Sequence, residues 1–184
     1  VQTCALPISK AIEGDHSLMR FTRIVTKDLA DAADYCKSKQ IQLGDEFQDV
    51  LVDPEIAAVV LATPHSMHAE QIIAAAKAGK HVFCEKPLAL TYQDALAAIK
   101  ACEENRVILA VGQNKRFWPS MAKLREVVAN STLGTLMHIE GHYSNEHSTK
   151  FFSDWREKPT ESPAGGLTGT GIHIIDAMVN LAGR

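Results

Sequence analysis

The sequence predicts an α/β fold in which a doubly wound parallel sheet is followed by the start of a second, α+β domain. Residues 57–62 (AAVVLA) form a continuous apolar run without alternation, as expected of a strand buried on both faces of a parallel sheet. Strand-like and helical patterns alternate along residues 21–111 with short connections between them. Such alternation produces right-handed crossovers and brings the carboxyl ends of the strands, where ligands bind, to one edge of the sheet.

The first strand and helix lie near the start of the chain. Residues 21–25 are β-favouring, and residues 29–40 carry apolar side chains at roughly helical spacing, which predicts a strand followed by a helix. Asp45 offers an acidic cap with Gln48 three residues later, a pattern typical of a helix start. We therefore expect a short helix that ends near residues 53–54.

Two longer helices are expected to cover the sheet. Residues 66–78 predict a helix that ends at Gly79 and carries an apolar stripe, which we interpret as core. Thr91, with Asp94 three residues later, predicts the start of a helix over residues 92–105. The stripe consists of Ile72, Ile73 and Ala76, and the remaining strands are expected over residues 81–84 and 107–111.

The pattern changes after residue 112, and we expect a domain boundary over residues 112–118. A helix is predicted over residues 119–129, with Pro119 in its first turn. Residues 135–144 alternate in polarity and predict a strand with one wetter face. A long loop over residues 145–166 and a final amphipathic helix over residues 172–181 complete the prediction.

Composition excludes several classes of partner. A net charge of -3 without a basic cluster argues against binding nucleic acid or an anionic membrane surface. The longest apolar stretches are far shorter than the roughly 20 residues that cross a bilayer, so no membrane is expected. Four cysteines without a C-x-x-C pair suggest reduced thiols and a cytoplasmic protein. The pairs His65/His68 and His142/His147 supply no zinc set with a fourth ligand, so no metal is expected.

The strongest motif is the run GKHVFCEKPLA, residues 79–89, between an expected strand and an expected helix cap. Together with the T-P-x-x-x-H element of residues 63–68, it resembles the Gfo/Idh/MocA oxidoreductase family, of the glucose-fructose oxidoreductase and inositol dehydrogenase type. The resemblance extends over residues 21–184. It implies that Lys86 lies at the carboxyl end of a strand, before a cis proline, beside a nicotinamide ring and the substrate hydroxyl. An ammonium there lowers the cost of developing alkoxide charge and can pass a proton.

A second cluster, residues 165–176 (GGLTGTGIHIID), is similar to the family element G-G-x-L-x-D-x-G-x-H-x-x-D. The resemblance implies that His173 is the catalytic histidine and that Asp176, one helical turn later, could orient it. A histidine that merely caps the helix is the alternative. The sequence departs from the family at Gly169, where many members carry an aspartate, so a Lys-Asp-His arrangement cannot be complete and the substrate class stays open.

The family's cofactor loop, G-x-G-x-x-G, has no counterpart before Phe21. We therefore interpret the chain as an internal fragment whose sheet is incomplete at its N-terminus, and expect the fragment itself to be inactive. The expected division is a non-native leader over residues 1–9, a partial dinucleotide-binding (Rossmann) domain over residues 10–116, and a truncated second domain with an open sheet over residues 117–184.

Cofactor contacts are carried over residue by residue. Thr26 and Lys27 end the strand that touches the adenosine ribose in doubly wound proteins, where a base accommodates a 2′-phosphate, so NADP is weakly favoured over NAD. A solvated Lys27 and a surface Arg156 are the alternatives. The cofactor-binding residues are Thr26, Lys27, Thr63, Pro64, His68, Glu85, Lys86, Arg116, Trp155 and Arg156, and the substrate-binding residues are Lys86, Arg116, His173 and Asp176.

The resemblance implies an NAD(P)-dependent oxidoreductase that transfers hydride between the cofactor and a sugar, cyclitol or related polyol. A non-catalytic relative that binds NAD(P) or a sugar is the main alternative, and a bilin reductase on the same fold is a third. The family's second domain commonly mediates assembly, which implies a homo-oligomer for the full-length parent.

Overall fold

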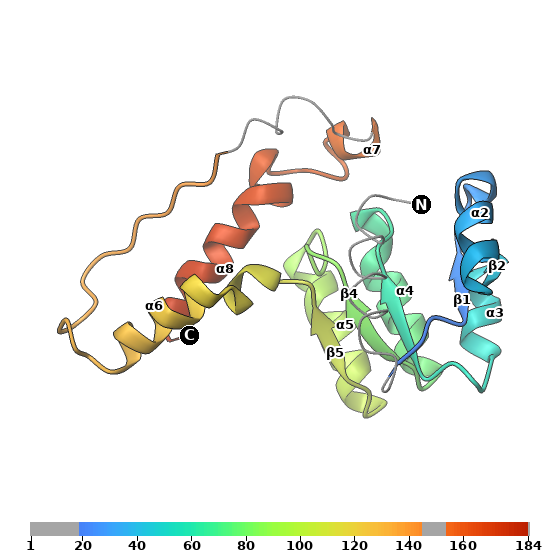
Figure 1. The fold of residues 1–184 in the computed structure, drawn as a ribbon, viewed down its shortest axis with the longest axis horizontal. Coiled ribbons are helices and arrows are strands. Elements are labelled where there is room, and N and C mark those ends of the chain that lie inside the picture. The colour runs from blue at the N-terminus through green and yellow to red at the C-terminus, as the bar shows by residue number, and fades with distance from the viewer. Residues whose placement is uncertain (1–18, 145–153, 184) are drawn as a thin grey trace.

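The computed structural model describes residues 19–144 and 154–183, so the expected leader over residues 1–9 lies outside the described residues. Figure 1 shows the strands and helices α2–α5 as one part of the molecule, with helices α6–α8 extending from it. No helix in the described ranges combines the length and apolar character needed to cross a membrane.

The described strands form two parallel ladders, which confirms the expected parallel sheet. One ladder pairs β1 (Arg23–Val25) with β2 (Gln42–Gly44). The other has the order β3 (Ala58–Leu61), β4 (His81–Cys84) and β5 (Leu109–Val111). In the doubly wound order 3-2-1-4-5-6, these ladders occupy positions 3-2 and 4-5-6, and no described strand occupies position 1. The short β2 was not expected, because three residues carry no periodic pattern.

Helices α2 (Leu29–Lys39) and α3 (Phe47–Val52) confirm the two helices expected first along the chain. The predicted acidic cap of α3 is wrong in detail. The helix begins after Glu46, whose side chain makes no capping hydrogen bond. Glu46 instead pairs with Lys27.

The helices on either side of β4 begin and end near the predicted residues. A short 3₁₀ turn, η1 (His65–Met67), leads into α4 (His68–Lys77), and Gly79 follows with φ +73°, as a helix stop requires. Before α5 (Tyr92–Glu104), Thr91 Oγ1 accepts the amide of Asp94 at 3.1 Å. The Thr91 hydroxyl also donates to the Asp94 carboxylate at 2.7 Å, so the predicted cap forms.

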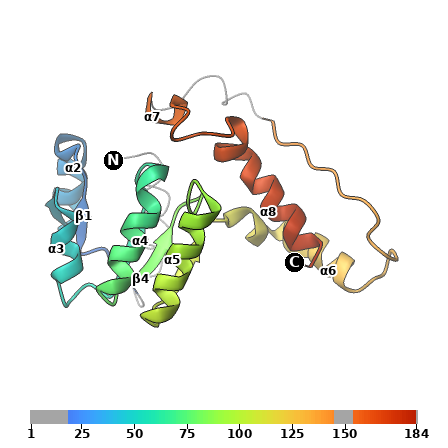
Figure 2. The same cartoon turned by 180° about the vertical axis from the view of Figure 1, so that it is seen from behind.

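The core lies between the second ladder and helices α4 and α5, which pack against each other (Figure 2). The expected stripe is confirmed, because Ile72 and Ala76 are fully buried and Ile73 packs against them. The expectation that β3 is buried on both faces is wrong: Ala58 is exposed and Val60 only half-buried. The described helices α4 and α5 account for the buried face, which consists of Val59, Leu61, Val82 and Cys84.

The described cysteines Cys36, Cys84 and Cys102 are free and buried. Burial, helped by the charge of Glu85, raises the pKa of the Cys84 thiol to about 12, so that thiol stays protonated at neutral pH. These cysteines act as small core side chains.

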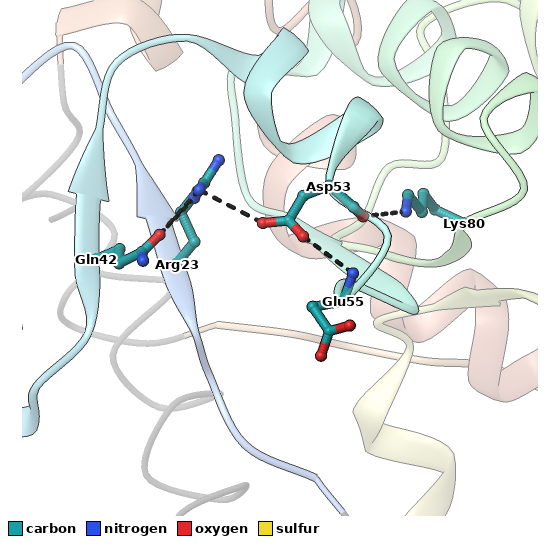
Figure 3. A network of polar contacts seen from close by, with 5 residues as sticks. All are labelled: Arg23, Gln42, Asp53, Glu55 and Lys80. Atoms are coloured by element: carbon teal, nitrogen blue, oxygen red, sulfur yellow. Dashed lines mark hydrogen bonds and ion pairs between the residues drawn. The ribbon is translucent and has the colours of Figure 1, made fainter.

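A polar network connects the two ladders at the amino ends of their strands (Figure 3). Asp53 precedes β3, and its carboxylate pairs with Arg23 of β1 at 3.4 Å and accepts the amide of Glu55 at 3.0 Å. Buried Lys80 donates to the Asp53 carbonyl at 2.6 Å, and Arg23 also donates to Gln42 of β2 at 2.8 Å. The network therefore connects both ladders at the edge opposite Lys86.

The second part of the chain differs from its prediction in three places. Helices α6 (Pro119–Ala129) and α8 (Ile172–Leu181) confirm the prediction, but a short helix α7 (Asp154–Glu157) lies inside the expected loop. The π-helical turn Leu167–Gly171, which precedes α8, was also not expected. Residues 145–153 of the expected loop lie outside the described residues.

The strand expected over residues 135–144 is not formed. The segment is extended, but no described strand runs beside it, and a strand needs a ladder partner (Figure 1). It is largely exposed and contacts α8 at Gly141, where an added Cβ would collide with Ile174. The alternation of polar and apolar residues therefore predicted an extended backbone correctly. It could not predict strand pairing, because pairing requires a neighbouring strand.

Candidate active site

A pocket of about 210 Å³ opens at the carboxyl ends of β3 and β4. The parallel sheet explains its position, because the loops that follow neighbouring strands emerge at the same edge. Six predicted site residues meet here, from three separate segments: Thr63, His68, Glu85, Lys86, Trp155 and Arg156. Ala62, His65, Gly169 and Thr170 complete the lining.

Lys86 lies two residues after the end of β4, and the Lys86–Pro87 bond is cis, as the resemblance implied. Its Nζ donates to the backbone carbonyl of Gly169 at 2.6 Å. The π-helical turn thus brings a carbonyl oxygen to the lysine at the position where the family's aspartate is missing. A backbone carbonyl accepts a hydrogen bond without adding a negative charge to the pocket.

Glu85 is held between Lys86 and the loop after β5. Its carboxylate accepts the Lys86 amide at 3.2 Å. A Cβ on Gly112 would lie 3.2 Å from the same carboxylate, so the glycine makes room for it. The acidic side chain is therefore part of a packed wall.

His68 is fully buried and connects two of the loops that line the pocket. Its Nδ1 lies 2.7 Å from the Pro87 carbonyl, and its Nε2 lies 3.0 Å from the Thr63 carbonyl. The Thr63 hydroxyl donates to Gln71 at 2.6 Å. Both ring nitrogens of His68 therefore face backbone carbonyls, which gives this histidine a scaffolding role.

His173 lies at the start of α8, only 9% exposed, and its Nδ1 has no partner among the described residues. Burial lowers its pKa most, and the charges of Lys86 and Lys115 add to this, against an opposing effect of Asp176. The resulting pKa is about 4, so the imidazole is neutral at physiological pH. A neutral imidazole can accept a proton from a hydroxyl.

Asp176 does not orient His173 as expected, because its carboxylate is engaged by Arg116. The guanidinium Nε donates to Oδ2 at 3.1 Å and Nη2 pairs with Oδ1, a bidentate arrangement that outcompetes a single imidazole hydrogen bond. This hydrogen bonding raises the pKa of Arg116. Arg116, in η2 (Asn114–Phe117), therefore joins α8 to the segment after β5 and does not line the pocket.

Thr26 and Lys27 lie at the end of β1, in the other ladder, and do not line the pocket. The Lys27 ammonium donates to the Asp45 carbonyl at 2.9 Å and pairs with the Glu46 carboxylate at 3.1 Å, on side chains that are largely exposed. Pro64 is likewise absent from the lining, although its neighbours on both sides contribute to it. The ion pair between Lys27 and Glu46 was not predicted from the sequence.

Two residues of this region were missed by sequence reasoning. His65 lines the pocket and is buried, with the ring of Trp155 edge-on at 4.9 Å. Its position inside the T-P-x-x-x-H element was the available signal. Glu161 contacts His65 and Ser66, and no pattern connects residues so far apart in the chain. Within the described ranges, no group of three or more His, Cys, Asp or Glu side chains is arranged to hold a metal.

Comparison with known proteins identifies the family of both parts of the chain. Residues 8–113 match the oxidoreductase family with an NAD-binding Rossmann fold, and residues 121–184 match the GFO/IDH/MocA C-terminal domain. Levoglucosan dehydrogenase from Pseudarthrobacter phenanthrenivorans is 33% identical over 76% of this chain and 36% of its own length. The Bacillus subtilis scyllo-inositol 2-dehydrogenase (NADP(+)) IolW is 29% identical over 88% of this chain and 42% of its own length.

A solved structure of levoglucosan dehydrogenase in complex with NADH and levoglucosan superposes with a TM-score of 0.78 at 29% identity. The superposed region covers 87% of this chain and 44% of the levoglucosan dehydrogenase chain. The chain thus spans about two fifths of the length of these relatives. Since the two family matches together cover nearly the whole sequence, the chain belongs to the Gfo/Idh/MocA oxidoreductase family, with its NAD-binding Rossmann fold.

Proposed function

We propose that the full-length protein containing this chain is an NAD(P)-dependent oxidoreductase that transfers hydride between a nicotinamide and the carbinol carbon of a sugar, cyclitol or related polyol. The observation that carries the proposal is that Lys86 lines the pocket and that its charge reaches His173, which does not line the pocket itself. Lys86 is held on the Gly169 carbonyl at the carboxyl end of β4, and its charge helps to lower the pKa of His173 to about 4.

The residues present fit the nicotinamide end of the cofactor. A pocket of about 210 Å³ is smaller than the roughly 300–1,000 Å³ of sites that enclose a drug-sized ligand, so it suits one end of a dinucleotide. Thr63, Glu85, Trp155 and Arg156 would hold that end, and the bound nicotinamide supplies the hydride acceptor or donor. The relatives' names, which mention NADH and NADP(+), support this class of cofactor.

Two side chains divide the proton chemistry. The Lys86 ammonium stabilises negative charge that develops on the substrate oxygen, and burial strengthens that interaction. His173 is neutral, and its Nδ1 has no hydrogen-bond partner among the described residues, so it accepts the hydroxyl proton. Named relatives that act on levoglucosan and scyllo-inositol support a carbinol substrate.

A non-catalytic binding protein is the second candidate, favoured by one observation. Gly169 leaves the Lys86 ammonium on a neutral carbonyl where a carboxylate would complete a charged arrangement. The retained Lys86 and His173 argue against this candidate, because binding alone requires neither group.

Replacement of Lys86 by Met in the full-length protein tests the proposal. With NAD⁺ or NADP⁺ and a panel of sugars and polyols, we expect kcat to fall by about 10²–10⁴, the usual loss for a positioned proton-transfer group. Cofactor affinity should change little, because the ammonium acts on the substrate oxygen. The exposed Lys77→Met on α4 is the matched control. An unchanged kcat, with hydride transfer rate-limiting, would favour the binding protein.

A further inference from the structure

The short helix α7 and the residues after it dock onto the turn that leads into α4. Glu161 is the centre of this contact. Its carboxylate accepts the Ser66 amide at 3.0 Å and the Ser66 hydroxyl at 2.5 Å, and its carbonyl lies 2.7 Å from His65 Nδ1. We call His65, Ser66, Trp155 and Glu161 the Glu161 latch.

The contacts of the latch determine how His65 is held. A carbonyl only accepts hydrogen bonds, so His65 Nδ1 carries the proton that it shares with Glu161. The ring of Trp155 also contacts His65, edge-on with an interplanar angle of 83°. Between these partners His65 is only 5% exposed. Two residues of the segment that contains α7, Trp155 and Glu161, therefore contact the His65 imidazole.

The latch also determines part of the pocket. His65, Trp155 and Arg156 are three of its ten lining residues. Arg156 lies over the Trp155 ring at 4.4 Å, so both side chains depend on the placement of α7. A helix of 4 residues is too short to be stable by itself, so the position of α7 depends on contacts with other segments.

We propose that Glu161 is a positioning residue that holds α7 against His65 and thereby sets where Trp155 and Arg156 stand in the cofactor pocket. The inference rests on the proposed function for its cofactor readout. Its structural basis is independent, because the latch connects segments that are 95 residues apart without any ligand. Burial would raise the pKa of Glu161, but the two Ser66 donors and His65 outweigh it and lower that pKa, so the carboxylate is charged at neutral pH.

The test combines hydrogen exchange with kinetics in the full-length protein. Glu161→Ala removes both carboxylate contacts with Ser66. We expect amide exchange at residue 66 and across residues 154–166 to quicken about tenfold or more, and KM for the cofactor to rise about tenfold, since hydrogen bonds to a charged group are among the stronger ones. The value of kcat should stay within about twofold, because Glu161 is absent from the pocket lining and makes no contact with the reacting groups.

Two variants separate the latch from general unfolding. Glu161→Gln keeps one acceptor for Ser66 and should give intermediate exchange and an intermediate KM. Ser66→Ala removes only the hydroxyl donor and should raise KM less than Glu161→Ala. Glu126→Ala on α6, whose carboxylate pairs only with exposed Lys123 in the described contacts, should change neither quantity.

Each result decides the inference. Faster exchange over residues 154–166 with a raised KM and a preserved kcat supports it. Unchanged exchange in Glu161→Ala overturns the latch, and faster exchange with an unchanged KM overturns its link to the pocket. If the wild-type protein binds no nicotinamide cofactor, the proposed function fails and the cofactor role fails with it, while the exchange experiment still decides whether Glu161 holds α7.

Discussion

His173 has a lowered pKa because of burial and of two lysines that come from different segments. Burial at the start of α8 and the charges of Lys86 and Lys115 disfavour its protonated form. Lys115 also lies 3.8 Å from the centre of the Trp118 ring, an attraction that holds its ammonium next to the residue before α6. The imidazole, whose ordinary pKa is 6.5, therefore stays neutral until the pH approaches about 4.

The pH profile of the full-length protein tests this tuning. If neutral His173 accepts the proton, kcat/KM falls only as pH drops through its pKa of about 4, well below the ordinary value of 6.5. Lys115→Met removes a nearby cation, so the pKa should rise and the acid limb should move to higher pH. Lys123→Met, on an exposed lysine of α6, is the control. An acid limb near the ordinary histidine value, unmoved by Lys115→Met, would remove His173 from the role of base.

Cofactor preference tests Lys27. Its charge favours a 2′-phosphate, although Glu46 at 3.1 Å offsets part of that attraction. Because both side chains are largely exposed, we expect Lys27→Asp to lower the ratio of kcat/KM for NADP to that for NAD by about fivefold, equivalent to about 1 kcal/mol. Glu46→Gln should move the ratio in the opposite direction. A parent that prefers NAD and does not respond to Lys27→Asp would identify Lys27 as a solvated surface residue.

At the scale of single elements, helix ends explain why α4 and α5 lie where the sequence predicts. The start of α5 is set by the reciprocal contacts of Thr91 and Asp94, and the end of α4 by Gly79. These signals are local, since each involves residues within one turn of the helix end. The π-helical turn before α8 is the contrasting case, because its reach toward Lys86 depends on a distant loop.

Two glycines with equal space around them provide a matched stability test. No atom lies within 4 Å of a Cβ added at Gly79 or Gly44, but only Gly79 has a positive φ, of +73°. Gly79→Ala should therefore destabilise the protein by about 1 kcal/mol through backbone strain alone. Gly44→Ala should be neutral or slightly stabilising. Equal denaturant midpoints for the two variants would show that Gly79 is not needed to end α4.

At the scale of the whole molecule, side chains at the amino ends of the strands connect the two ladders. The network of Asp53 lies at the amino ends of the strands, and the pocket lies at the carboxyl ends of β3 and β4, in the second ladder. The stability of the fold and the proposed chemistry of the pocket therefore depend on different side chains. Substitutions in the network should lower the free energy of unfolding and leave kcat nearly unchanged.

Asp53→Ala tests this separation in the full-length protein. The substitution removes the contact with Arg23 and the acceptor for the Glu55 amide, which should lower the free energy of unfolding by about 1–2 kcal/mol. Lys80 keeps its partner, since that partner is the backbone carbonyl. The exposed Asp34→Ala on α2 is the control. A loss of kcat without a loss of stability would contradict a purely structural role for the network.

The sequence by itself determined the parallel α/β architecture, the ends of α4 and α5, and the family, because these depend on short-range patterns. Apolar runs predict buried strands, and a cap or a glycine acts within a single turn. The run around Lys86 and the histidine before Asp176 were likewise readable, since their residue types and spacing lie within a dozen positions.

Only the tertiary structure decided which of these residues act together. Asp176 binds Arg116 instead of His173, and Glu161 contacts Ser66 from another part of the chain. Residues 135–144 stay extended, with no partner strand in the part of the chain that the structure describes. Each outcome is a competition among groups distant in sequence, settled by geometry and burial. A sequence pattern carries no record of distance in space, so these pairings follow from the fold alone.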